Sequence, residues 1–145
     1  KLLDLVAVEA AEVHADWRTK WEKKYDPRTL KLLDRAKTVT QERKREVTEL
    51  RLGLRQDVER IMDEIGIDIW ISPASTSTAP LGIGSTGNSA MNAPWSYAGM
   101  PTTALRAGRS ADGLPIGLQV TGRFEQDEET VAYSRLLEPL LLDGA

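Results

Sequence analysis

The sequence predicts an α/β protein whose first half is helical and whose second half holds several strands and a final helix. Apolar side chains recur at helical spacing up to residue 66, and short β-branched segments bounded by Pro and Gly follow. The density of charged residues falls at the same point. Residues 1–66 hold 15 basic and 14 acidic side chains, whereas residues 67–145 hold 4 basic and 8 acidic ones. We therefore expect a helical segment, residues 1–66, followed by an α/β segment, residues 67–145.

Three helical stretches are predicted in the first half. Residues 2–22 have an apolar face at helical spacing. Asp26 is placed to cap a short second helix that begins at Pro27. The third helix starts near Thr40 and is closed by Gly66. Its apolar stripe consists of Val47, Leu50, Leu54, Val58, Ile61 and Ile65.

The second half predicts three strands and a helix. A buried strand over residues 67–72 is stopped by Pro73, and Thr102–Arg106 and Pro115–Thr121 are the next two strands. The polar connection Ala107–Leu114 joins them. Asp127 is expected to cap the final helix, which should end at about Glu138 because Pro139 follows.

Composition excludes several classes of function. The chain has no cysteine, so disulfides, thiolate metal sites and a cysteine nucleophile are excluded, and a reducing cytoplasm is the expected location. No apolar run reaches the roughly 20 residues of a membrane-spanning helix. The first half lacks the basic excess of a nucleic-acid-binding face. We expect no cofactor, no metal, no nucleic acid and no membrane as partners.

Residues 69–105 contain no Asp, Glu, Lys or Arg, although 28% of the chain is charged. One interpretation is a flexible Ser/Thr/Gly linker. Against it stand aromatic residues such as Trp95 and Tyr97, which flexible linkers rarely contain. The favoured interpretation is irregular backbone buried under other structure, of the kind that commonly lines sites.

Three patterns in the sequence are better explained by structure than by function. Gly82–Gly87 matches the Gly-x-Gly-x-x-Gly dinucleotide pattern, but it follows no strand directly and opens no amphipathic helix. His14, the single histidine, is expected on a helix surface and not in a Ser-His-Asp triad. The acidic group at residues 125–129 is expected at a helix start, where it needs no metal.

Several ordered segments carry a resemblance to a known family. They are Asp68-Ile69-Trp70-Ile71-Ser72-Pro73-Ala74, Ala79-Pro80-Leu81-Gly82, Asn92-Ala93-Pro94-Trp95-Ser96-Tyr97-Ala98-Gly99-Met100-Pro101 and Gly113-Leu114-Pro115-Ile116-Gly117-Leu118-Gln119-Val120-Thr121-Gly122, with Asp127 and its helix behind them. In this order they resemble the C-terminal third of the amidase signature family. The resemblance is carried by residues 66–138, and the helical first half agrees only in pattern.

The resemblance implies the C-terminal part of an α/β/α fold around a large mixed sheet, so that both segments form a fragment of one larger domain. It implies a hydrolase of carbon–nitrogen (amide) bonds that uses a Ser–cis-Ser–Lys triad, with lysine as the base. The family's Gly-Gly-Ser-Ser signature is absent here, and no lysine follows Lys44. We therefore assign no catalytic residue, and we expect these residues alone to be inactive.

The resemblance also implies that the loop after Pro73 helps to shape the substrate pocket. Thr86, Asn88, Asn92 and Trp95 are the candidate substrate-binding residues, because uncharged polar groups and an indole can hold a small amide substrate without salt bridges. Structural explanations stay open, since Asn92 can cap a short helix and Trp95 can belong to the core.

Glycine, proline and glutamine near these candidates have structural explanations as well. Gly99 and Pro101 are expected to set backbone geometry, and Gln119 can be a satisfied buried amide.

The partner expected from the resemblance is the remainder of the amidase fold, with a homo-oligomer as a further option. Two alternatives are a fragment of the kind found in the glutamyl-tRNA amidotransferase branch of the family and a non-catalytic helical interaction module. In such a module, the apolar stripe of the long helix would pair with a partner helix as a short coiled coil.

Overall fold

The computed structural model describes residues 1–142 and divides the chain into two compact units, Lys1–Gly53 and Leu54–Ala145. The boundary between these units falls inside one long helix. The predicted change at residues 66/67 marks a different feature, the end of that helix before the first strand. Residues 143–145 of the predicted α/β segment lie outside the described residues.

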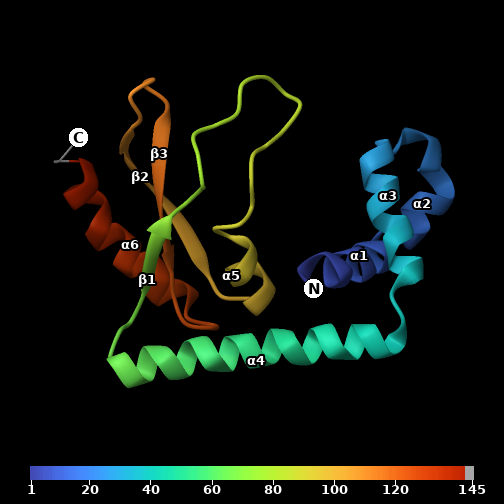
Figure 1. Ribbon diagram of the computed structural model, residues 1–145, viewed down its shortest axis with the longest axis horizontal. Helices are drawn as coiled ribbons and strands as arrows, with labels where there is room; N and C mark the ends of the chain where they lie inside the picture. The colour runs from blue at the N-terminus through green and yellow to red at the C-terminus, as the bar shows by residue number, and fades with distance from the viewer. Residues whose placement is uncertain (143–145) are drawn as a thin grey trace. The chain divides into compact units, whose positions relative to one another are not determined.

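The first unit is helical, as predicted. It contains α1 (Leu2–Val13), α2 (Ala15–Trp21), α3 (Pro27–Arg35) and the first part of α4 (Gln41–Ile65), with short 3₁₀ turns at Glu22–Lys24 and Ala36–Thr38 (Figure 1). Its fully or nearly fully buried apolar side chains are Leu5, Ala7, Leu33 and Val47.

Local capping explains where these helices begin. The Asp26 side chain accepts a hydrogen bond from the backbone N–H of Arg28 at 2.8 Å, and Pro27 occupies the first turn, which confirms the predicted cap. Thr40 Oγ1 accepts from the backbone N–H of Arg43 in the same way. His14 separates α1 from α2, so the apolar face over residues 2–22 belongs to two helices.

A cluster of ion pairs around the buried carboxylate of Asp4 stabilises the first unit. Asp4 is only 7% exposed, and its two carboxylate oxygens accept hydrogen bonds from Arg35 at 2.7 Å and from Arg43 at 2.9 Å. The hydrogen bonds from Arg35, and then those from Arg43, lower the pKa of Asp4 below its usual value. One carboxylate therefore joins α1 to the end of α3 and to the start of α4.

The long helix ends in a left-handed glycine, as predicted. Gly66 has φ +68°, its N–H donates to the Asp63 carbonyl, and the Ile67 N–H donates to the Met62 carbonyl at 3.0 Å. This pair of bonds is the Schellman arrangement, which satisfies carbonyls that the helix end would otherwise leave open.

The second unit is built on a three-stranded sheet in the order β1-β3-β2. The strands are β1 (Trp70–Pro73), β2 (Thr102–Arg109) and β3 (Pro115–Thr121), and β3 pairs antiparallel with both neighbours. The α/β class is confirmed. The three strands themselves pair only antiparallel, so a mixed sheet would require further strands.

The strand boundaries differ from the predicted ones at two places. The first strand begins at Trp70 and includes Pro73, whereas the sequence predicts residues 67–72. Pro73 is tolerated because β1 is an edge strand of this sheet and a missing N–H there costs little. The second strand continues beyond Arg106 to Arg109 across a bulge at residue 107, with Gly108 at φ +129°.

The final helix, α6 (Asp127–Leu142), lies against β2. The prediction that Asp127 is the cap is off by one residue, because Asp127 is already helical and the Gln126 carbonyl accepts the Thr130 N–H. The predicted end at Glu138 is wrong, because Pro139 lies inside the helix. A proline only biases the preceding residue, and this one removes a single backbone hydrogen bond close to the helix end.

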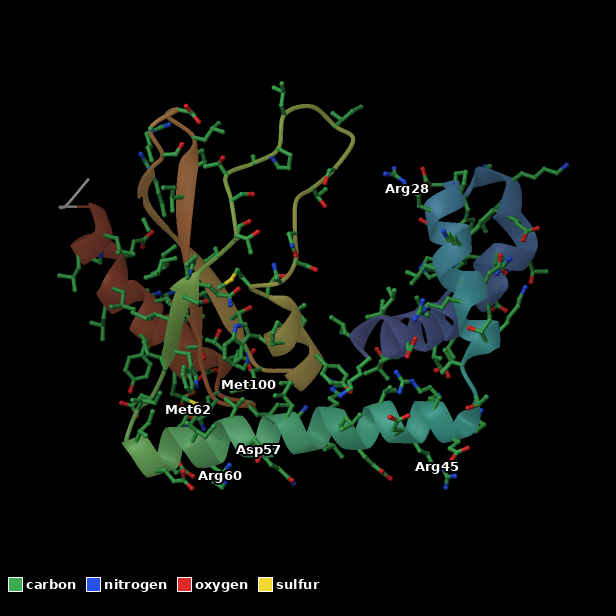
Figure 2. The ribbon with its side chains drawn as sticks, in the orientation of Figure 1. Arg28, Arg45, Asp57, Arg60, Met62 and Met100 are labelled. Carbon is green, nitrogen blue, oxygen red and sulfur yellow. The ribbon has the colours of Figure 1, made fainter. Side chains whose placement is uncertain are left out.

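The apolar core of the second unit forms between α4, α5 (Ala93–Ala98) and the strands. Met62, Ala98 and Met100 are buried, and Leu54, Val58, Ile67, Trp70 and Trp95 pack against them. Figure 2 shows Met62 on α4 close to Met100. Val47, Leu54 and Val58 of the predicted stripe therefore pack inside the chain, whereas Leu50 is 38% exposed. Met62, absent from the predicted stripe, is fully buried, while Ile65 is 59% exposed.

Polar contacts hold the last turns of α4 in the second unit. Arg55 donates to the Ala98 carbonyl at 2.8 Å and lies 3.3 Å above the centre of the Phe124 ring. Arg123 pairs with Asp63 at 2.7 Å.

No helix among residues 1–142 is long and apolar enough to cross a membrane.

Replacing Asp4 by asparagine should weaken the first unit and flatten its response to acid. Because the folded pKa of Asp4 is lowered, its contribution is fully present above the unfolded pKa of about 4 and is lost as pH falls below that value. Urea unfolding followed by helical circular dichroism, from pH 7 down to pH 2.5, measures this loss. Asp16→Asn, at an exposed residue of α2, is the control. Equal pH profiles for both variants would contradict the role of Asp4.

Replacing Gly122 by alanine should destabilise the second unit by about 1–3 kcal/mol, as overpacking does. A Cβ at this position would lie 3.0 Å from Thr130 Cβ and closer still to Thr130 Oγ1, and Thr130 is 1% exposed. Gly84→Ala is the matched control, because nothing lies within 4 Å of its Cβ position. The midpoint of chemical unfolding should be lower for Gly122→Ala than for Gly84→Ala. Equal midpoints would contradict the close packing of Gly122 against Thr130.

Candidate functional site

The middle of the uncharged stretch, residues 74–92, forms a long and largely exposed loop between β1 and α5. Figure 1 shows it projecting away from the sheet. Leu81 and Ile83 are fully exposed, and residues 79–90 are exposed throughout. The expectation that the stretch is buried under other structure is therefore wrong for residues 79–90, although Tyr97, Ala98 and Met100 at its other end are buried. Short polar side chains of the loop form hydrogen bonds with nearby backbone N–H groups instead, so these groups have partners although the loop is exposed.

A groove lies between the loop and the start of β3. It has a volume of about 500 Å³ and is lined by residues 75–80, by Thr86 and Gly87, and by residues 115–117 of β3. The Ala74 N–H donates to the Gly117 carbonyl at 2.8 Å, which fixes the first residue of the loop to β3. A Cβ at Gly117 would lie 2.9 Å from the Cβ of Ala74, so this close approach requires glycine.

Two of the four sequence candidates lie on the loop. Thr86 lines the groove. Asn88 is exposed, does not line the groove, and its Oδ1 accepts the Ala90 N–H at 2.9 Å in a local turn.

The other two candidates lie at α5. Asn92 is exposed at the N-cap position, but its side chain makes no capping hydrogen bond. Trp95 is half-buried on the apolar cluster, with its ring centre 6.2 Å from that of Trp70. The structure thus brings Asn92 and Trp95 together on one short helix and places only Thr86 in the groove.

Gln119 determines where the far end of the loop lies. This side chain is 4% exposed, and its Nε2 donates to the Met91 carbonyl at 3.2 Å and to Ser72 Oγ at 3.5 Å. The explanation as a satisfied buried amide is confirmed.

Gly99 ends α5 in the left-handed conformation, with φ +74°. Its N–H and that of Met100 both donate to the Trp95 carbonyl, at 2.8 Å and 3.0 Å. The expected role of Gly99 in backbone geometry is therefore confirmed.

Sequence reasoning singled out none of the hydroxyl residues at the start of the groove. Ser75, Thr76, Ser77 and Thr78 follow β1 directly and line it together with Thr86. A run of Ser and Thr immediately after a strand end places hydroxyls at the sheet edge, and this position in the chain is the signal that identifies them.

The glycine pattern, the single histidine and the acidic group at residues 125–129 all lie in structural positions. Gly82–Gly87 lies in irregular backbone and opens no helix. His14 is half-buried, its Nδ1 lies 2.7 Å from the Tyr25 hydroxyl, and its ring meets Trp17 edge-on, so it is less exposed than expected. The acidic residues at 127–129 form the first turn of α6, and no group of metal-ligating side chains occurs within residues 1–142.

Tyr133 is a titratable group of the second unit whose pKa is clearly shifted. Burial and the nearby carboxylate of Asp68 raise the pKa of Tyr133, which keeps its hydroxyl protonated at neutral pH. The second unit contains no lysine and no histidine at all. The residues that line the groove carry hydroxyl, apolar and backbone groups, and they include no lysine, histidine or carboxylate.

Comparison with known sequences gives one consistent family. A family model described as Amidase matches residues 9–131. A glutamyl-tRNA(Gln) amidotransferase subunit of Beijerinckia indica subsp. indica is 35% identical over 98 residues, which cover 61% of this chain and 20% of that protein. The putative amidase AmiD of Mycobacterium tuberculosis is 31% identical over 132 residues, which cover 84% of this chain and 27% of that protein.

Solved structures agree with the sequences. A crystal structure of an amidase matches 96% of this chain with a TM-score of 0.80 at 27% identity, over 34% of its own length. The 6-aminohexanoate cyclic dimer hydrolase matches 93% of the chain with a TM-score of 0.73 at 21% identity, which shows likeness of fold. The chain spans about a fifth to a third of the length of these proteins. Since the family model covers most of its residues, the chain belongs to the amidase family.

Proposed function

We propose that this chain supplies a wall of the substrate pocket and part of the sheet in a hydrolase of amide (carbon–nitrogen) bonds. The observation that carries the proposal is the groove beside β3, in a chain whose fold matches an amidase. The chain contributes no member of a Ser–cis-Ser–Lys triad. Its part is to bind and position the substrate, which can supply a large share of a rate enhancement.

The groove can form one side of a substrate pocket, but its lining residues do not include the catalytic groups of a complete active site. Its base is fixed to β3 by the Ala74–Gly117 hydrogen bond, and the far end of the loop is held by Gln119 through the Met91 carbonyl. Binding sites combine such fixed backbone with a few polar groups. Thr86 lies in this wall, and we assign Asn88, Asn92 and Trp95 to the surface that continues beyond it toward α5.

The partner in this proposal is the remainder of the amidase fold. The relatives are three to five times longer than the matched segment, so the loop has other structure available to cover it. A small amide is the proposed substrate of the assembled enzyme. The absence of cysteine is suited to the reducing cytoplasm, where we place the protein.

A second candidate function is part of an amidotransferase. It rests on the 35% identity with the Beijerinckia indica protein, which is described as a glutamyl-tRNA(Gln) amidotransferase subunit. The longer match is to the putative amidase, over 84% of the chain, and we therefore prefer the free-standing amidase.

The chain by itself should not hydrolyse amides, because no activated nucleophile is present. Ammonia release from simple amides such as acetamide and benzamide, measured with the purified chain, should equal the buffer rate. Mixing the chain with a separately produced catalytic part of an amidase should restore turnover if the wall completes the site. Turnover by the chain alone that disappears in one Ser→Ala variant would contradict the proposal.

The chain by itself should also self-associate, because its loop exposes large apolar side chains that a partner should cover. Sedimentation velocity should show concentration-dependent species larger than a monomer. The double variant Leu81→Asp/Ile83→Asp removes the two fully exposed side chains and should shift the distribution toward the monomer. A matched control is Ser89→Asp, which adds charge to the same loop but removes no apolar surface. A monomer at all concentrations would indicate an independent module instead.

A further inference from the structure

We propose that residues 17–29 of the first unit form a docking surface for an acidic protein segment that carries an aromatic or aliphatic side chain. This stretch includes most of α2, the turn Glu22–Lys24 and the start of α3, and we call it the tryptophan surface (Figure 1). Its partner is separate from the amide substrate proposed above and does not involve the groove beside β3.

Two large indole side chains are open to solvent on the tryptophan surface. Trp17 and Trp21 are each 50% exposed, and their spacing of four residues places them on the same face of α2. Both border a hollow of about 650 Å³, whose other lining residues are Lys24, Tyr25, Asp26 and Thr29. A second hollow of about 420 Å³ is lined by residues 19–24 and shares Trp21 with the first. Exposed aromatic side chains beside such hollows are typical anchors of protein interfaces.

His14 fixes one wall of the first hollow. Its Nδ1 lies 2.7 Å from the Tyr25 hydroxyl, and its ring meets the Trp17 ring edge-on with the two centres 5.2 Å apart. Trp17 and Tyr25 are therefore held relative to each other before a partner arrives. An aromatic wall that is ordered in advance loses little conformational entropy on binding.

The arginines of the tryptophan surface are paired with carboxylates of the same unit. Arg18 lies 3.1 Å from Glu22 and 2.9 Å from Asp34. Arg28 lies 3.1 Å from Asp26, which also caps α3. These pairs neutralise both carboxylates of residues 17–28.

The lysines of the tryptophan surface remain uncompensated, which identifies the partner as acidic. Residues 17–28 hold five basic and two acidic side chains, although the whole chain has a net charge of −3. Lys20, Lys23 and Lys24 line the second hollow, and none of them has an ion-pair partner among residues 1–142. Three ammonium groups beside an exposed indole favour carboxylates that flank an apolar side chain.

A protein segment fits this surface better than a nucleic acid or a membrane does. The exposed carboxylates of Glu22 and Asp26 lie among the lysines, where a continuous row of phosphates would meet them. A polypeptide can place its carboxylates at the lysines and leave them out elsewhere. It can also insert an aromatic or aliphatic side chain into the hollow beside the indoles and bury apolar surface there.

Peptide binding to the whole chain tests the proposal, with the four tryptophans as reporters. The probe is the blocked peptide Glu-Glu-Phe-Glu-Glu-Phe-Glu-Glu, and two comparison peptides replace every Glu by Gln or both Phe by Ser. In ¹H–¹⁵N spectra of the monomer, the acidic probe should shift the indole N–H signals of Trp17 and Trp21 in a saturable way. The signals of Trp70 and Trp95, in the second unit, should stay in place. Each comparison peptide should bind roughly tenfold more weakly. Equal affinities, or equal shifts of all four indoles, would overturn the proposal.

Removing two of the free lysines should weaken binding of the acidic probe. Lys20→Gln/Lys24→Gln should lower the affinity roughly tenfold and make it less sensitive to salt. Lys1→Gln/Arg45→Gln is the matched control, because it removes the same charge from exposed residues of the first unit that line neither hollow; Arg45 lies on α4 (Figure 2). Equal losses in both variants would show a general charge effect and would refute the site.

Removing the indole that borders both hollows should have a larger effect. Trp21→Ala should abolish binding of the acidic probe with unchanged helical circular dichroism, and Trp21→Phe should retain most of it. Leu52→Ala is the control, since Leu52 is an apolar residue of α4 that is 47% exposed and lines neither hollow. Full binding by Trp21→Ala would contradict the anchor.

Other occupants of the tryptophan surface would be recognised in the same experiment. Tighter binding of an oligouridylate, or of vesicles that contain phosphatidylserine, than of the acidic probe would assign the surface to a nucleic acid or to a membrane. Shifts of the Trp17 and Trp21 signals with protein concentration alone would assign it to a second copy of the chain. Loss of probe binding when the catalytic part of an amidase is added would assign it to the remainder of the fold. Each of these results would overturn the proposal.

Discussion

The second unit depends on the central position of β3. Both β1 and β2 are hydrogen-bonded to it, so its register fixes theirs. Its last three residues are buried, and Gln119 among them reaches beyond the sheet to the Met91 carbonyl. At its other end, Gly117 holds Ala74. The strand thus holds both ends of the long loop, at Ala74 and Met91, which lie 17 residues apart in sequence.

Both units combine buried apolar side chains with contacts of charged groups, and the charged contacts differ between them. In the first, the Asp4 carboxylate bonds two arginines and ties three helices together, which makes the arrangement directional and dependent on pH. In the second, Met62, Ala98 and Met100 form an apolar cluster, and Arg55 and Arg123 hold α4 to the neighbouring loops. The helix α4 takes part in both units, with Val47 buried in the first and Met62 buried in the second.

Features determined by a few neighbouring residues could be predicted from the sequence. The Asp26 cap, the left-handed end at Gly66 and the strand Pro115–Thr121 all follow from local chemistry and are confirmed. Features that depend on distant partners could not. Pro139 lies inside α6 and does not end it. Met62 is buried in the core although the predicted stripe did not include it, and Leu81 and Ile83 are fully exposed to solvent. The four site candidates rest on residue type, and only the folded loop shows that Thr86 borders the groove while Asn88 turns to its own backbone.

The connectivity of the sheet also has a kinetic consequence. The ladder between β2 and β3 begins with Arg109 and Pro115, which are 6 positions apart in sequence, whereas the ladder between β1 and β3 begins with Pro73 and Leu118, which are 45 positions apart. Loop-closure entropy makes the second contact more costly by about 2 kcal/mol at the same contact strength. We therefore expect the hairpin of β2 and β3 to form first and the uncharged loop to close last. Until β1 docks, the uncharged loop with its exposed Leu81 and Ile83 is unrestrained, and this is the stage of folding at which the chain is most exposed to aggregation.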